Sequence, residues 1–118
     1  MTIEEEFESL WANAGSPPDV VLFFRNHRPE NSQQWLSVLR IDQHRRWRTS
    51  SPLRVEDYLI ALPELPAGIQ WKLELAIGEY EARSRTSLPL SEAEISSRFS
   101  DISDTLRERI KQSSTYHP

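Results

Sequence analysis

One local stretch of the chain carries side chains that could bind another molecule. Guanidinium groups beside an indole can bind phosphates and stack on bases, and this combination occurs in the basic cluster His44, Arg45, Arg46, Trp47 and Arg48. Arg46 and Arg48 recur 37 residues later as Arg83 and Arg85, and basic groups near a helix C-terminus complement the helix dipole. A structural role is therefore favoured over contact with a protein partner, and such contact over nucleic-acid binding.

No residue pattern predicts catalysis. The histidines His27, His44 and His117 lack the paired helical spacing that a metal site needs, and the chain has no cysteine. No serine lies in a Gly-x-Ser-x-Gly motif, and acidic pairs such as Glu92 and Glu94 are explained by stabilisation of a helix N-terminus. We therefore expect that the chain has no catalytic residue, no metal site and no cofactor, and that it is not an enzyme.

The motif Arg-x-Arg-Thr-Ser occurs twice and is typical of sites modified by arginine-directed kinases. Its hydroxyl residues are Thr49 and Ser50 in the first copy and Thr86 and Ser87 in the second. A phosphate there would place negative charge at a helix C-terminus, which is unfavourable unless the arginines compensate. A helix stop followed by a polar turn is the favoured interpretation.

Apolar residues recur at helical spacing along nearly the whole chain, which predicts an all-α fold. Thr2 and Glu5 have the spacing of a capping box, as do Ser91 and Glu94. The apolar run 20–24 is ambiguous because β-branched and aromatic residues crowd together there. A short helix is favoured over a strand for this run.

An internal repeat is the strongest signal in the sequence. At an offset of 37 residues, positions 46–53 align with 83–90, and six of these eight are identical. Each copy predicts a long helix, a proline turn and a short helix, and a weaker first copy covers 11–24. One helix pair cannot bury its own apolar face, so the pairs are expected to stack into a compact bundle of about six or seven helices.

The repeat also predicts the domain boundaries and the core. We expect a single domain over 1–111, with units of about 3–28, 32–65 and 69–102, a last helix at 103–111 and a flexible tail at 112–118. Gly78, inside a predicted helix, indicates that a neighbour packs closely. The residues expected to be buried are Trp35, Leu36, Leu39, Tyr58, Leu59, Leu73, Ile77, Tyr80, Ile95 and Phe99.

The paired arginines carry an energetic expectation. Arg46 and Arg83 should reach carboxylates or helix-end carbonyls within the domain, as exposed ion pairs worth up to about 1 kcal/mol each. Arg83→Ala should then leave the domain folded, whereas Phe99→Ala should cost about 3 to 5 kcal/mol.

The residues of the repeat resemble a known family segment. Positions 39–48, the Ser51-Pro52 turn, and positions 55–65 are similar to the helical segment that precedes the kinase domain in planctomycete-type bacterial serine/threonine protein kinases. The chain itself lacks the kinase motifs, since its three glycines cannot form a Gly-rich phosphate loop. The resemblance implies a non-catalytic protein-interaction or regulatory module of a bacterial signalling protein, whose partner is another protein or an adjoining domain.

The composition fits such a module. The 14 basic and 18 acidic side chains leave a formal charge of −4, so no overall field draws the chain to nucleic acid or anionic lipid. The acidic start at residues 1–8 is unlike a secretory signal, no apolar window approaches a membrane span, and the absence of cysteine fits a reducing compartment. We expect a soluble, cytoplasmic protein that does not bind membranes. Two alternatives remain: a nucleic-acid-binding helical domain that uses 44–48, and a death-fold-like adaptor that forms homo-oligomers.

Overall fold

The computed structural model describes residues 1–13 and 15–114, and within them the chain forms seven helices and no strand. The all-α fold is therefore confirmed. None of these helices is long and apolar enough to cross a membrane. The helices are α1 (Ile3–Asn13), α2 (Val20–Asn26), α3 (Ser32–Arg46), α4 (Val55–Ala61), α5 (Trp71–Arg83), α6 (Glu92–Arg98) and α7 (Ser103–Ser114).

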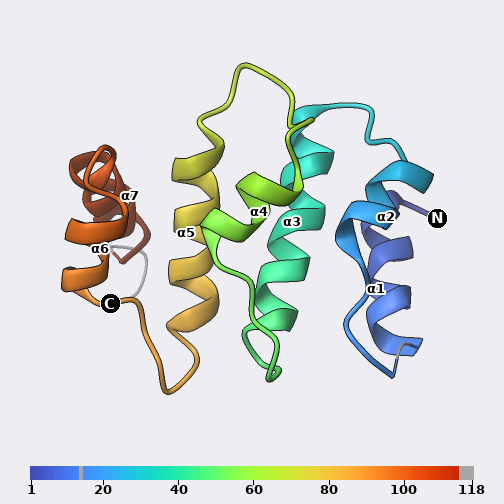
Figure 1. Cartoon of the computed structure of the whole chain (residues 1–118), viewed down its shortest axis with the longest axis horizontal. Helices are drawn as coiled ribbons and strands as arrows, with labels where there is room; N and C mark the ends of the chain where they lie inside the picture. The colour runs from blue at the N-terminus through green and yellow to red at the C-terminus, as the bar shows by residue number, and fades with distance from the viewer. Residues whose placement is uncertain (14, 115–118) are drawn as a thin grey trace.

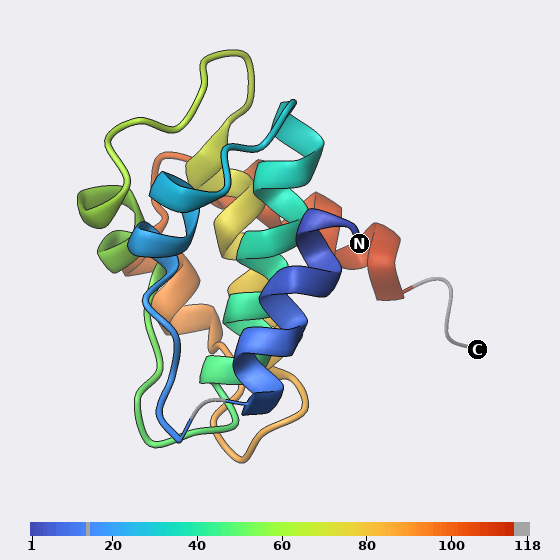
Figure 2. The same cartoon turned by 90° about the vertical axis from the view of Figure 1, so that its right-hand side faces the viewer.

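The helices form two layers. The long helices α1, α3 and α5 stand side by side in a row, and α7 packs against α5 at the end of that row (Figure 1). The short helices α2, α4 and α6 lie together on one face of the row (Figure 2). Each long helix is thus followed in the chain by a short helix, so the structure contains three helix pairs in sequence, with α7 added at one end.

Local capping explains where the first helices begin. The Thr2 N–H donates to Glu5 Oε1 and the Glu5 N–H donates to Thr2 Oγ1, both at 3.1 Å, so the predicted capping box is present. The Asp19 carboxylate accepts hydrogen bonds from the Val21 and Leu22 N–H groups. The ambiguous run 20–24 is therefore part of a helix, as favoured, because an N-cap residue satisfies its first amide groups.

The second predicted capping box is only half formed. The Ser91 hydroxyl accepts a hydrogen bond from the Glu94 N–H at 3.1 Å. The Glu94 carboxylate does not return to the Ser91 backbone, because it binds Arg83 and Arg98 instead. Two arginines are stronger partners for a carboxylate than one neutral amide.

The three short helices have matching ends. Each contains seven residues, and the backbone N–H of the next residue donates to the carbonyl of a buried residue one turn earlier. These donor and acceptor pairs are His27 to Phe23, Leu62 to Tyr58 and Phe99 to Ile95. The matching ends are what three related helix pairs would produce, and the 37-residue period itself stays a prediction.

The C-terminal boundary differs from the expectation. Helix α7 continues to Ser114, so positions 112–114 are helical rather than part of a tail. Its first turns are anchored by Leu106, which is fully buried, and a helix once formed gains a hydrogen bond with each added residue. Positions 115–118 of the predicted tail, and with them His117, lie outside the described residues.

The core contains most of the residues expected there. Six of the ten are buried: Leu39, Tyr58, Leu73, Ile77, Ile95 and Phe99. The other four, Trp35, Leu36, Leu59 and Tyr80, are partly buried and pack against the core from its margin. The core also holds polar side chains that helical periodicity did not predict: Asp42, Gln43, Arg46, Glu79 and Arg83.

Gly78 confirms the expected close approach. The Gln43 side chain of α3 lies against this glycine of α5 and donates a hydrogen bond from Nε2 to the Leu75 carbonyl at 2.8 Å. A Cβ atom at position 78 would lie 1.9 Å from Gln43 Oε1. The absence of a side chain at Gly78 therefore lets α3 and α5 pack closely.

Candidate interaction surface

The structure divides the basic cluster between the core and the surface. Arg46 is only 9% exposed, and its Nε donates to Asp42 Oδ2 at 2.7 Å. A second guanidinium nitrogen of Arg46 donates to the Pro18 carbonyl at 2.6 Å. Arg46 thus reaches a carboxylate and a backbone carbonyl inside the domain, as expected, but burial leaves no free guanidinium there for a partner.

The Asp42 carboxylate is the centre of a small buried polar group. The Tyr58 hydroxyl donates to Asp42 Oδ2 at 2.6 Å, so α4 is tied to α3 through this atom. Burial raises the pKa of Asp42, and the Tyr58 and Arg46 contacts oppose that rise. Burial also raises the pKa of Tyr58, with the Asp42 charge adding to the effect. The group therefore holds α3 and α4 together.

Trp47 is occupied by an internal contact. The Arg83 guanidinium lies 4.7 Å from the centre of its ring, and the Arg46 guanidinium lies 5.7 Å from the ring of Trp11. Each tryptophan therefore covers an arginine of the following helix pair. The Trp47 indole N–H donates no hydrogen bond within the part of the chain that the structure describes. With Arg83 on its ring, Trp47 is not available to stack on a base.

Arg45 forms a surface link between two long helices. Its guanidinium donates to the Glu8 carboxylate of α1. Both side chains are about two-fifths exposed, and ion pairs of this kind contribute at most about 1 kcal/mol. Arg45 is therefore partly engaged, although a partner could compete for it.

His44 and Arg48 remain at the surface, where the structure adds Arg85. Arg48 and Arg85 are exposed, and neither side chain has a hydrogen bond or ion pair within the described residues. Burial lowers the pKa of His44, and Arg85, Arg48 and Arg40 lower it further against the opposing effect of Glu81. We call His44, Arg48 and Arg85 the basic edge. In the sequence, Arg85 stands out only because it aligns with Arg48 in the repeat.

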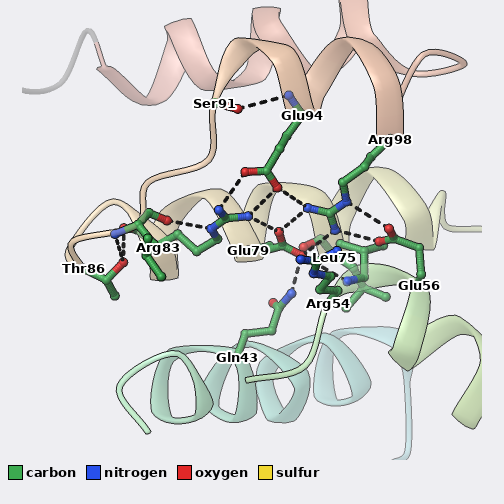
Figure 3. A network of polar contacts seen from close by, with 12 residues as sticks. Gln43, Arg54, Glu56, Leu75, Glu79, Arg83, Thr86, Ser91, Glu94 and Arg98 are labelled. Atoms are coloured by element: carbon green, nitrogen blue, oxygen red, sulfur yellow. Dashed lines mark hydrogen bonds and ion pairs between the residues drawn. The ribbon is translucent and has the colours of Figure 1, made fainter. Parts of the chain in front are cut away.

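A buried charge network joins the last two helix pairs (Figure 3). The Glu79 carboxylate is fully buried and accepts hydrogen bonds from Arg83, Arg98 and the Val55 N–H at 2.8 to 3.1 Å. Glu94 binds the same two arginines at 2.8 to 2.9 Å. The network therefore connects α4, α5 and α6 through one carboxylate.

Two outer contacts complete the network. Arg98 makes a bidentate pair with Glu56 of α4 at 2.7 and 2.9 Å. Arg83 also donates to the Leu88 carbonyl at 2.8 Å, in the turn after its own helix. Hydrogen bonds from Arg83 and Arg98 lower the pKa of Glu94 to about 2. A carboxyl group that exchanges protons near neutral pH would need the opposite shift.

The two Arg-x-Arg-Thr-Ser motifs form matching helix stops. Thr49 Oγ1 donates to the Arg46 carbonyl at 2.7 Å and accepts the Ser51 N–H at 3.1 Å. Thr86 Oγ1 makes the corresponding contacts, to the Arg83 carbonyl at 2.8 Å and from the Leu88 N–H at 3.1 Å. The turn interpretation accounts for both motifs, because the first arginine of each is buried and each threonine hydroxyl is engaged.

Two further observations bear on function. Among the described residues, no three histidine, aspartate or glutamate side chains are arranged to hold a metal ion. No protein-family model matches the chain, and the comparisons with curated proteins and with solved structures give no significant match.

Proposed function

We propose that the chain is a non-catalytic protein-interaction or regulatory module of a bacterial signalling protein, and that its basic edge contacts an acidic segment of the partner. The observation that carries this proposal is that the exposed side chains of Arg48 and Arg85 make no hydrogen bond or ion pair within the described residues, whereas Arg46 and Arg83 are buried in ion pairs. A carboxylate-rich segment is the natural ligand of unpaired guanidinium groups.

The remaining polar chemistry supports a structural use of the charged residues. Glu56, Glu79 and Glu94 bind arginines, and Asp42 binds Arg46 and Tyr58. Ion pairs of this kind hold helices in register. The resemblance to the segment that precedes a kinase domain makes an adjoining kinase domain the first partner to test.

Binding of an acidic probe tests the proposal. A fluorescein-labelled peptide of ten glutamates is titrated with the protein, and fluorescence anisotropy reports the dissociation constant. The double variant Arg48→Ala/Arg85→Ala should weaken binding about tenfold, because it removes the two unpaired guanidinium groups of the edge. Equal affinity of this variant and the wild-type chain would refute a role of the basic edge.

Matched controls separate the edge from net charge. Arg25 and Arg28 are also exposed and have no partner within the described residues, but they lie at the end of α2 and after it. Arg25→Ala/Arg28→Ala removes the same charge and should change affinity by less than about twofold. An equal loss in both double variants would mean that only the total charge matters.

A nucleic-acid-binding domain is the second candidate, favoured by the same exposed guanidinium groups. It is weakened by the internal positions of Arg46 and Trp47, since few cations and no free indole remain at the edge. Titration of a single-stranded and a duplex oligonucleotide at several salt concentrations distinguishes it from the first. Tighter binding to an oligonucleotide than to the glutamate peptide, with a steep salt dependence, would favour this second candidate.

A further inference from the structure

A hollow of about 370 Å³ lies between α1 and α2. These two helices stand at one end of the helix row (Figure 1). The lining of the hollow is mostly apolar and includes Leu10, Pro17, Pro18, Leu22 and Phe23. Leu10 is 43% exposed and Leu22 is 51% exposed, so two large aliphatic side chains face solvent beside the hollow. We call this hollow the α1–α2 groove.

The contacts between neighbouring helix pairs indicate which kind of side chain fits the groove. Inside the domain, Trp11 at the end of α1 covers Arg46, and Trp47 at the end of α3 covers Arg83. In both cases an aromatic side chain from one helix pair lies on the next pair. The pair formed by α1 and α2 comes first in this order, so no preceding pair of the described residues covers it.

Leu10 occupies the position in α1 that receives such an aromatic side chain elsewhere. It directly precedes Trp11, as Arg46 directly precedes Trp47. Phe23 lines the groove together with Leu10, and in the second pair Tyr58 and Arg46 both bind Asp42 Oδ2. The groove is therefore the counterpart, on the first helix pair, of the surface that Trp11 covers on the second.

Two differences set the chemistry of the occupant. The charged Arg46 is replaced at this position by an apolar leucine, so an apolar anchor fits better than a polar one. Two carboxylates lie at the groove: Asp19 lines it, and Glu6 of α1 lies 3.2 Å from Nε2 of His27, which also lines it, whereas Arg25 and Arg28 line a separate hollow with Trp35 and Glu64. Positive charge on the occupant is therefore complementary to its surroundings.

We propose that the α1–α2 groove binds a cationic amphipathic helix of a partner protein, with an aromatic residue near the end of that helix as its anchor. The partner helix would extend the row beyond α1 and repeat the contact by which tryptophans join the helix pairs. This surface is separate from the basic edge, because it is lined by residues between positions 10 and 27 and by none of His44, Arg48 and Arg85.

The test uses a labelled synthetic peptide of 18 residues, made of leucine and lysine in helical register with one tryptophan near its C-terminus. Fluorescence anisotropy should show saturable binding to the wild-type chain. A peptide with glutamate in place of lysine, or with alanine in place of the tryptophan, should bind at least about tenfold more weakly. Equal binding of the lysine and glutamate peptides would overturn the predicted charge preference and with it the proposal.

Variants of the chain locate the binding site. Leu22→Ser and Leu10→Ser should each weaken the lysine peptide about tenfold, while circular dichroism shows that these half-exposed positions leave the fold intact. Ile60→Ser is the control, because Ile60 is 81% exposed on α4 and lies outside the groove. An equal loss with Ile60→Ser would show nonspecific apolar contact and overturn the proposal.

Three further measurements locate the bound peptide, test for a second copy as the occupant, and separate the groove from the basic edge. Amide chemical-shift changes on addition of the lysine peptide should concentrate on α1, α2 and the turn between them. Sedimentation of the unliganded chain should show a monomer, since a dimer that Leu22→Ser dissociates would make a second copy the occupant and refute the proposed partner. Arg48→Ala/Arg85→Ala should leave the affinity for the lysine peptide unchanged, so failure of the edge and failure of the groove are distinguishable.

Discussion

Arg83 lies against the ring of Trp47, 4.7 Å from its centre, while its guanidinium binds the buried Glu79 carboxylate. Removing this arginine would leave Glu79 with Arg98 as its one remaining cationic partner. Breaking a buried ion pair costs several kcal/mol. We therefore expect Arg83→Ala to lower the free energy of unfolding by about 3 kcal/mol, in place of the small effect expected for an exposed pair.

Urea unfolding followed by circular dichroism measures this loss. Arg107→Ala is the control, because Arg107 binds Glu92 and Asp104 at the surface of the same domain. It should cost less than about 1 kcal/mol. If Arg83→Ala also cost less than about 1 kcal/mol, the buried ion pair of Arg83 would contribute no more to stability than an exposed pair.

The second prediction concerns the contact of α3 with α5. Gly78→Ala would bring the new methyl group against Gln43 Oε1 and the Arg40 side chain, so one of these must move. We expect a loss of about 1 to 3 kcal/mol in the free energy of unfolding, which outweighs the gain in helix propensity of about 1 kcal/mol. Thermal unfolding measures the difference.

Two companion variants identify the cause of that loss. Gly15→Ala should change stability little, because no atom lies within 4 Å of a Cβ at that position. Gln43→Ala/Gly78→Ala should recover part of the loss, since the side chain that collides is then absent. If Gly78→Ala stabilised the chain, the close packing of α3 on α5 at Gly78 would be wrong.

The local parts of this fold are predictable from the sequence. The capping pair of Thr2 and Glu5, the Asn31 cap of α3 and the seven-residue helices depend on residues only a few positions apart. The buried charge network was not predictable, because Glu56 and Arg98 are 42 residues apart and meet only when the helix pairs stack. The burial of Arg46 was not predictable for the same reason, because the Pro18 carbonyl that it binds is 28 residues away in the chain.

The two repeat-related carboxylates, Asp42 and Glu79, have different partners in the structure. The position of Tyr58 in one copy is Ile95 in the other, so Glu79 cannot receive the hydroxyl that Asp42 receives. The Val55 N–H and Arg98 bind Glu79 instead. A self-comparison of the sequence aligns the two acidic residues, but it does not show that their partners have changed.

Tyr58→Phe tests that difference. The variant removes the hydroxyl that donates to Asp42 Oδ2 and leaves Arg46 as the hydrogen-bond donor to that carboxylate. We expect a loss of about 1 to 3 kcal/mol in the free energy of unfolding, because a buried acceptor loses a partner. Tyr80→Phe is the control, since Tyr80 is only partly buried at the core margin. An equal loss in both variants would show that the hydrogen bond from Tyr58 to Asp42 adds nothing to the free energy of unfolding.

The last prediction is the loss of stability in acid. Hydrogen bonds from Arg83 and Arg98 hold the Glu94 pKa at about 2, below the ordinary value of 4.5. A carboxyl group whose pKa is lower in the folded state stabilises that state above its unfolded pKa, and this stabilisation disappears as the pH falls from about 4.5 to about 2. Glu94 should therefore account for up to about 3 kcal/mol of the decrease in the free energy of unfolding over that window. Asp42 acts in the opposite sense, since burial raises its pKa and protonation then favours the folded state.

Urea unfolding at pH 6, 4 and 3 should show a shallower decrease in the free energy of unfolding for Glu94→Gln than for the wild-type chain. Glu108→Gln, at an exposed position of α7, should follow the wild type. An unchanged slope in Glu94→Gln would mean that the Arg83 and Arg98 contacts do not stabilise the ionised carboxylate.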